Sequence, residues 1–164
     1  MIAILQRVSE ASVEIDGVVT GAVGKGYMIL LGVAKGDTEL DGELLAEKIS
    51  KLRIFEDESG KMNLSVNDVA GGVLVVPNFT LLASYRRGNR PDFMGSERPE
   101  EARRLFDHFC NTMEKLVSKV ARGTFGAHMH VSLLNDGPIT IPMDSAVLRQ
   151  PKKQAHSAHF EETL

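Results

Sequence analysis

The sequence is poor in cysteine and aromatic residues, and it has no long apolar run. Its 164 residues include one cysteine and no tryptophan, and aromatic residues make up 5%. One cysteine excludes an intrachain disulfide and, with no signal-like start, favours a cytoplasmic location. The longest apolar stretch, residues 27–34, is interrupted by Gly32 and is too short to span a bilayer, so no membrane partner is expected.

The sequence also lacks a surplus of positive charge. Acidic residues number 22 and basic residues 19, which gives a net charge of −3. Proteins that coat nucleic acid without sequence preference usually carry a basic surplus, so this class is excluded. A nucleic-acid substrate held by a small local patch is still compatible with this charge. The low aromatic content argues against a broad stacking platform for single strands.

Apolar periodicity predicts strands in the first forty residues. Apolar residues alternate at Val13 and Ile15, and Asp16-Gly17 then gives the strongest short signal for a hairpin. The continuous apolar runs at 27–31 and 73–76 predict strands that are buried on both faces or lie in a closed barrel.

Helical spacing of apolar residues predicts two main helices. The first covers about 40–52 and is capped by Asp37 or Thr38. The second begins near Pro99 with Ser96 as its cap, and its apolar face continues to Val120 before Gly123 ends it.

Alternation at 125–133 then predicts a half-buried strand, which is broken at 135–138 and resumes at 139–143. The fold class expected is α+β, with a mostly antiparallel, barrel-like sheet and two main helices packed outside it. Residues 1–145 are expected to form one domain, and residues 146–164 a loosely ordered polar tail.

Residue type and spacing alone single out two kinds of side chain as candidates for catalysis or metal binding. Cys110 lies on the apolar stripe of the second helix, where a cysteine usually serves as a small core residue. His128 and His130 share one strand face at a spacing that can chelate a metal, but they equally suit the wet face of a strand. His156 and His159 lie in the tail and give a weaker signal.

A basic loop and one threonine complete the set of candidates. Arg86, Arg87 and Arg90 form the densest basic cluster, which suits either a phosphate-binding loop or a solvated surface. Thr80 follows a buried strand and has no recognisable base beside it in sequence, so residue type alone favours a strand former. Composition and spacing by themselves do not identify a function.

A series of collinear segments resembles the D-aminoacyl-tRNA deacylase family over residues 1–145. The segments are Gln6-Arg7-Val8, Ala11-Ser12-Val13, Leu31-Gly32-Val33 with Gly36-Asp37-Thr38, Lys48-Ile49 through Leu52-Arg53-Ile54-Phe55, Gly60-Lys61-Met62-Asn63-Leu64-Ser65, Phe79-Thr80-Leu81, Gly88-Asn89-Arg90-Pro91-Asp92-Phe93, Phe125-Gly126-Ala127 and Asn135-Asp136-Gly137-Pro138-Ile139-Thr140. Each segment alone is weak, but their order and spacing make the resemblance specific.

The resemblance implies a homodimer of barrel-like subunits that needs no metal or other cofactor. The implied reaction is hydrolysis of the ester that joins a D-amino acid to the end of tRNA, and also of glycine mischarged on the tRNA for alanine. Free D-amino acid and tRNA are the products. The implied partner is therefore tRNA rather than DNA.

The second family motif implies the element that selects the substrate. Gly137-Pro138, if cis as in the family, would present two carbonyl groups to the pocket of the partner subunit. These carbonyls would accept hydrogen bonds from the substrate ammonium group, and an L side chain would collide with them. Gly137 has no Cβ, so its backbone can approach closely. Arg7 resembles the family arginine that orients this dipeptide.

The first family motif, Ser-Gln-Phe-Thr, corresponds here to Pro77, Asn78, Phe79 and Thr80. Backbone N–H groups of Asn78, Phe79 and Thr80 are expected to polarise the ester carbonyl, with Thr80 positioning the site rather than attacking. Pro77 and Asn78 depart from the family pattern.

The departures keep two alternatives open. One is a relaxed paralogue that acts on other mischarged tRNAs, and the other is a module that binds the tRNA end without turnover. We expect Arg86, Arg87 and Arg90, with Lys25, to meet the acceptor end of tRNA.

Overall fold

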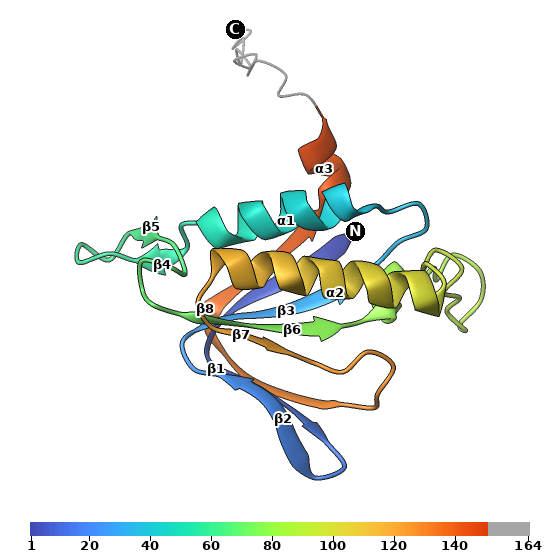
Figure 1. Cartoon of the computed structure of the whole chain (residues 1–164), viewed down its shortest axis with the longest axis horizontal. Coiled ribbons are helices and arrows are strands. Elements are labelled where there is room, and N and C mark those ends of the chain that lie inside the picture. Colours follow the sequence, from blue (N-terminus) through green and yellow to red (C-terminus); the bar gives the residue numbers. More distant parts are fainter. Residues whose placement is uncertain (151–164) are drawn as a thin grey trace, which may run out of the picture.

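The computed structural model describes residues 1–150, so the candidate residues His156 and His159 lie outside the described residues. Two helices lie side by side over one face of a curved sheet (Figure 1). No helix in the described residues is long and apolar enough to cross a membrane. The elements are β1 (Ile2–Ile15), β2 (Val18–Val23), β3 (Gly26–Gly32), α1 (Glu39–Lys51), β4 (Phe55–Glu56), β5 (Met62–Leu64), β6 (Gly72–Pro77), the 3-10 helix η1 (Phe79–Leu82), α2 (Pro99–Leu116), β7 (Val120–Arg122), β8 (His130–Asp144) and α3 (Ser145–Arg149).

The main sheet has the strand order β2-β1-β3-β6-β7, with β8 paired to β1. Strand β1 pairs antiparallel with β2, β3 and β8, whereas β3 with β6 and β6 with β7 are parallel pairs. The α+β class is therefore confirmed, but the sheet is mixed rather than mostly antiparallel. The reason is topological: parallel neighbours need a crossover, and α1 and α2 supply the two crossovers.

Apolar side chains fill both faces of the central strands. On the helix side, Ile29 and Val75 join a core with residues of α1 and α2. On the other side, Met28 and Leu74 pack with Val13 in a second cluster. Successive strand residues point to opposite faces, so the uninterrupted apolar runs follow from the need to fill both cores. The expectation of strands buried on both faces is confirmed.

The predicted hairpin joins β1 and β2. Asp16 and Gly17 both have positive φ, at 51° and 80°. This is the combination that a two-residue hairpin turn of type I′ requires.

The ends of α2 differ from the sequence prediction. The helix begins after Arg98 rather than Ser96, with Pro99 in its first turn, where a missing N–H costs no helical bond. Ser96 instead donates its hydroxyl to the carbonyl of Phe79 at 3.0 Å. The helix ends at Leu116, and residues 120–122 form β7 because β6 offers a parallel edge for pairing.

Strand β8 begins at His130 rather than at residue 125, and the predicted break appears as a protrusion. Its register on β1 jumps from Thr140 opposite Gln6 to Asn135 opposite Val8. Residues 136–139 therefore stand opposite a single residue of β1, which pushes them out of the ladder.

The predicted tail is wrong over its first residues, because α3 covers Ser145–Arg149. Buried Asp41 accepts a hydrogen bond of 2.7 Å from the Ser145 hydroxyl and also pairs with Arg149, which fixes α3 against α1. Burial favours the neutral form of Asp41, but hydrogen bonds from the Thr38 N–H, Ser145 and Arg149 outweigh it and lower the pKa of the carboxyl.

Candidate active site

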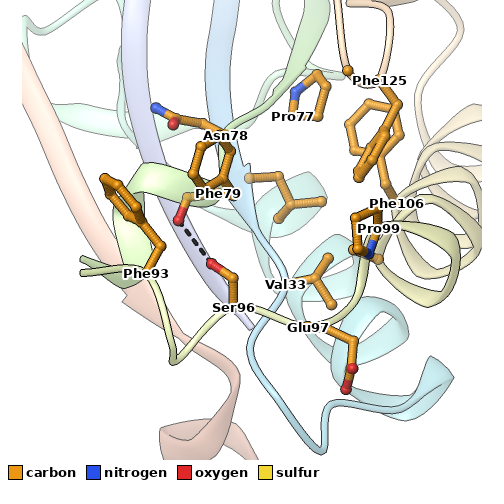
Figure 2. Close-up of a pocket in the computed structure, with 13 residues that line it drawn as sticks. Val33, Pro77, Asn78, Phe79, Phe93, Ser96, Glu97, Pro99, Phe106 and Phe125 are labelled. Atoms are coloured by element: carbon orange, nitrogen blue, oxygen red, sulfur yellow. Dashed lines mark hydrogen bonds between the residues drawn. The ribbon is translucent and has the colours of Figure 1, made fainter. Parts of the chain in front are cut away.

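A pocket of about 370 Å³ opens where β3 and β6 end and α2 begins. Ligand sites in sheets with parallel strands commonly lie beyond the carboxyl ends of those strands. The lining residues come from these strand ends, η1, the following loop, α2 and the segment before β8 (Figure 2): Leu31, Val33, Pro77, Asn78, Phe79, Phe93, Ser96, Glu97, Pro99, Ala102, Phe106, Phe125 and Gly126.

Two pairs of aromatic rings form opposite walls of this pocket (Figure 2). Phe79 and Phe93 meet edge to face with their centroids 5.0 Å apart. Phe106 and Phe125 lie 6.2 Å apart on the other side. Phe79 is 58% exposed, so its ring is available to a ligand. Such walls suit a flat aromatic group, for example a nucleobase.

The segment 77–80, which supplies Phe79 to one wall of the pocket, is held in place by hydrogen bonds within the segment and to β3. Asn78 caps η1, because its Oδ1 accepts the Thr80 N–H at 3.1 Å and also the Thr80 hydroxyl. The Asn78 N–H donates to the carbonyl of Leu31 at 2.8 Å. Two of the three N–H groups expected to polarise a substrate therefore already have acceptors. Within residues 1–150, the Phe79 N–H has no acceptor.

Gly32 permits η1 to lie this close to β3. A Cβ at Gly32 would stand 3.0 Å from the carbonyl oxygen of Asn78 and 3.1 Å from the Cβ of Leu81. Both distances are shorter than ordinary carbon contacts, and the first involves backbone that cannot rotate away. The glycine therefore sets the height of the segment 77–80 above the sheet.

Glu97 is the carboxylate among the pocket residues, and it is already engaged. Hydrogen bonds from the backbone N–H groups of Arg98 and Gly36, at 2.8 and 3.2 Å, lower the pKa of Glu97. Its carboxylate points away from the rings of Phe79 and Phe125 (Figure 2). The side chain is therefore ionised and poorly placed to act as a base for Thr80.

The protrusion of β8 is fixed by Arg7, which is 5% exposed. The Arg7 Nε donates to the carbonyl of Asp136 at 3.2 Å and lies 3.1 Å from its carboxylate. Asn135 donates its side-chain amide to the carbonyls of Arg7 at 2.9 Å and Ile139 at 3.0 Å. The structure thus brings Arg7 against the second motif, as the resemblance implied.

Gly137 and Pro138 are exposed at the tip of this protrusion, and the bond between them is cis. Gly137 has a φ of +128°, and a Cβ there would lie 2.9 Å from the backbone nitrogen of Ile139. Only glycine adopts this geometry without strain.

The two motifs do not meet within one chain. Arg7 pairs with Tyr27 near the start of β3, whereas the pocket begins at Leu31. Four residues of strand separate these points by about 13 Å. Residues 135–140 accordingly do not line the pocket of their own chain.

The basic loop is open to solvent. Ser84 and Asp92 pair through two backbone hydrogen bonds of 2.8 and 2.9 Å, and the loop between them carries exposed Arg86, Arg87 and Arg90. It leads directly into the pocket wall at Phe93. Lys25 is not part of this patch, because it lies over the Phe55 ring, 5.6 Å from the ring centroid, and does not line the pocket.

Cys110 is a core residue rather than a nucleophile. It is completely buried, and burial raises the pKa of its thiol to about 12. A thiol kept protonated in this way is a poor nucleophile at neutral pH.

The histidine pair is exposed, with ring centroids 5.3 Å apart. In the described part of the chain, His128 and His130 form no three-ligand cluster with a carboxylate. Three other side chains, Glu39, Glu43 and His108, do lie close enough to share a metal ion, with their ligand atoms within 4.8 Å of one another. His108 contacts Glu43 at 3.0 Å and Arg104 pairs with Glu39, so an ion-pair network between α1 and α2 accounts for the cluster.

Sequence reasoning missed the aromatic pocket. Phe93 and Phe125 lie in two of the segments that carried the resemblance, but Phe106 was assigned to the apolar face of a helix. The sequence did show an aromatic residue in each of these short segments. That their rings meet around one pocket is visible only in the fold.

Comparison with known proteins agrees with this geometry. The family described as D-Tyr-tRNA(Tyr) deacylase matches residues 4–144. A D-aminoacyl-tRNA deacylase of Roseiflexus castenholzii is 52% identical and covers 94% of this chain and 98% of its own length. One of Chloroflexus aurantiacus is 54% identical, with 93% and 96% covered.

Two solved structures share the fold. The c-Myc DNA Unwinding Element Binding Protein has a TM-score of 0.83 and 39% identity, covering 88% of this chain and 98% of that one. A probable eukaryotic D-amino acid tRNA deacylase has a TM-score of 0.73 at 17% identity, covering 87% and 98%, and shows the fold alone. The comparisons define an enzyme of the ester-hydrolase class. The chain belongs to the D-Tyr-tRNA(Tyr) deacylase family, which confirms the resemblance seen in the sequence.

Proposed function

We propose that this chain hydrolyses the ester between a D-amino acid and the terminal adenosine of tRNA. The observation that carries the proposal is the aromatic pocket beside Phe79 and Thr80, in the segment that corresponds to the first family motif. A nucleobase between the walls at Phe79 and Phe125 would gain about 1–3 kcal/mol by stacking on a ring. The ester on its ribose would then lie next to η1.

The hydrolysis needs little catalytic assistance from side chains, because an aminoacyl ester is already activated. Water attacks the carbonyl carbon, the bond to the ribose oxygen breaks, and that oxygen takes up a proton. The neighbouring ribose hydroxyl assists, so no side-chain nucleophile is needed. The Phe79 N–H is the best-placed donor for the developing oxyanion, and one such donor contributes about 3–4 kcal/mol. Thr80 holds Asn78 and η1 in position.

The selection step requires a homodimer. The gate at Gly137 and Pro138 is exposed and lies about 13 Å along the strand from its own pocket, so it serves the pocket of a partner subunit. Its carbonyls accept hydrogen bonds from the substrate ammonium and exclude an L side chain. Glycine carries no side chain to exclude, so glycine mischarged on the tRNA for alanine is also a substrate.

The variant first motif favours one alternative, a paralogue with relaxed selectivity. Pro77 has no N–H, and Asn78 uses its side chain to cap η1. Both changes alter the carbonyl side of the site while the gate and Arg7 are retained. Loss of turnover with retained binding of the tRNA end is the other alternative.

Single-turnover deacylation of D-Tyr-tRNA, L-Tyr-tRNA and Gly-tRNA tests these functions. Fast loss of the D and glycyl esters with the L ester spared supports the proposal. Comparable loss of the L ester indicates the relaxed paralogue, and no loss of any ester indicates a binding module. Sedimentation of the protein checks the dimer independently. We expect this activity in the cytoplasm, where charged tRNA is found, with tRNA as the nucleic-acid partner.

A further inference from the structure

Arg103 lies at the edge of the aromatic pocket. Pro99, Ala102 and Phe106 turn one face of α2 toward the pocket, and Arg103 follows directly after Ala102. Its guanidinium carbon stands 5.5 Å from the centroid of the Phe125 ring. Its Nη2 also reaches the carbonyl oxygen of Phe125 at 3.4 Å. The cation is thus stacked on one wall of the pocket.

The charge of Arg103 has no acidic partner among residues 1–150. The side chain is exposed, and no carboxylate in the described residues lies within ion-pair distance of it. Asp107, one turn further along α2, faces Arg122 at 3.9 Å instead. The adjacent Arg104 differs sharply, because it pairs with both Glu39 and Glu101. Two neighbouring arginines of one helix therefore serve different purposes.

We propose that Arg103 binds the phosphodiester that precedes the terminal adenosine of the tRNA. This rests on the proposed function, which places that adenosine against Phe125. Guanidinium has five N–H donors in a planar fork that matches phosphate oxygens, and the single bond to the Phe125 carbonyl leaves the other donors available. If a nucleoside is bound in the pocket, its phosphate group would lie at the pocket entrance, next to Arg103.

A second observation supports a nucleic-acid strand at this mouth. Phe93 and Phe125 lie on opposite walls of the pocket (Figure 2). The loop that carries Arg86, Arg87 and Arg90 leads in sequence into Phe93, whereas Arg103 lies over the Phe125 ring. Cations without an ion-pair partner in residues 1–150 are therefore attached to both walls of the pocket, through Phe125 and through the loop before Phe93. A chain with a net charge of −3 can bind a polyanion if its free cations gather in this way.

The test compares two esters that differ only in the phosphodiester. One is the D-tyrosyl ester of adenosine, and the other is the D-tyrosyl ester of the dinucleotide CpA. We expect Arg103→Gln to lower kcat/KM on the CpA ester by about tenfold, the effect of losing one hydrogen bond to a charged group. Its kcat/KM on the adenosine ester should stay within twofold of wild type, and Arg103→Lys should recover part of the loss. Arg104→Gln is the matched control and should change neither.

Two outcomes would overturn the inference about Arg103 without contradicting the proposed function. Equal losses on both esters would mean that Arg103 only positions Phe125, and no loss on either would mean that it binds no phosphate. The salt dependence of uncharged tRNA binding gives a readout free of turnover, and its slope should fall by about 0.7 in Arg103→Gln. A wild-type protein that hydrolyses neither ester would contradict the proposed function itself, and the binding slope would then decide on Arg103.

Discussion

Replacing Thr80 with alanine should lower the deacylase activity by about an order of magnitude or less, and should not abolish it. The Thr80 N–H donates to Asn78 Oδ1 at 3.1 Å, and alanine keeps that bond, so only the hydroxyl contact is lost. One neutral hydrogen bond contributes about 0.5–1.5 kcal/mol. If the whole of that is lost in the transition state, turnover falls by about two- to thirteenfold. Removal of a true nucleophile instead costs about a millionfold.

The assay is single-turnover hydrolysis of D-Tyr-tRNA by excess enzyme, with tRNA affinity and the midpoint of thermal unfolding measured in parallel. Thr80→Ser is the matched control, because it keeps the hydroxyl and removes only a methyl group. Asn78→Ala should slow turnover more than Thr80→Ala, since it removes the acceptor of both contacts.

A loss of more than about a thousandfold in Thr80→Ala, with fold and tRNA affinity intact and Thr80→Ser active, would refute this reasoning. It would make Thr80 a nucleophile, and the hydroxyl would then have to leave Asn78 to attack.

Four further predictions follow from the same contacts. Cys110 should resist iodoacetamide at pH values near ~8 until the protein unfolds, because burial raises the pKa of its thiol to about 12. Replacing Arg86 and Arg87 with glutamine should raise KM for D-aminoacyl-tRNA without lowering kcat, and should weaken its salt dependence between about 50 and 200 mM. The pKa of Asp41 is lowered in the fold from 3.8, so its contribution to stability is present above that value and is lost as the pH falls. In Asp41→Asn, the free energy of unfolding measured with urea should therefore fall less steeply as the pH is lowered. Gly137→Ala should destabilise the fold by about 1–3 kcal/mol in urea titration, given the φ of +128° and a 2.9 Å contact.

Each of these has a clear contrary result. Labelling of folded protein as fast as a free thiol would show that Cys110 is accessible. An unchanged KM in the double arginine variant would remove the loop from the tRNA interface. A fall in stability at low pH that is as steep in Asp41→Asn as in wild type would assign it to other carboxyls, and wild-type stability of Gly137→Ala would mean that the protrusion relaxes freely.

The parts of the fold that were predictable depend on local rules. The turn at Asp16 and Gly17 and the apolar face of α2 each follow from neighbouring residues, and the structure confirms them. The end of α2 was not predictable in this way. Val117 and Val120 continue the helical spacing, but the edge of β6 offers backbone partners to residues 120–122, and this pairing is non-local.

The pocket shows the same limit more strongly. Phe79, Phe93, Phe106 and Phe125 come from four separate segments, and no periodicity relates them. They meet because both crossover helices lie on one face of the sheet, which brings the carboxyl ends of β3 and β6 beside the start of α2. The resemblance to the family identified most of these segments in the sequence. The topology of the sheet and helices is what brings their aromatic rings together around the pocket.

Under the proposed function, the topology also explains why selection against L substrates would need a second copy of the chain. Arg7 holds the proposed gate against the middle of β1, opposite the start of β3, whereas the pocket opens where β3 ends. The four strand residues between these points span about 13 Å, which is more than the rotation of one side chain can close. A second copy can supply the gate without any change in the first. If residues 137–138 act as the proposed gate, this separation makes assembly a condition of selectivity, while the proposed donor at Phe79 and the aromatic walls lie within each chain.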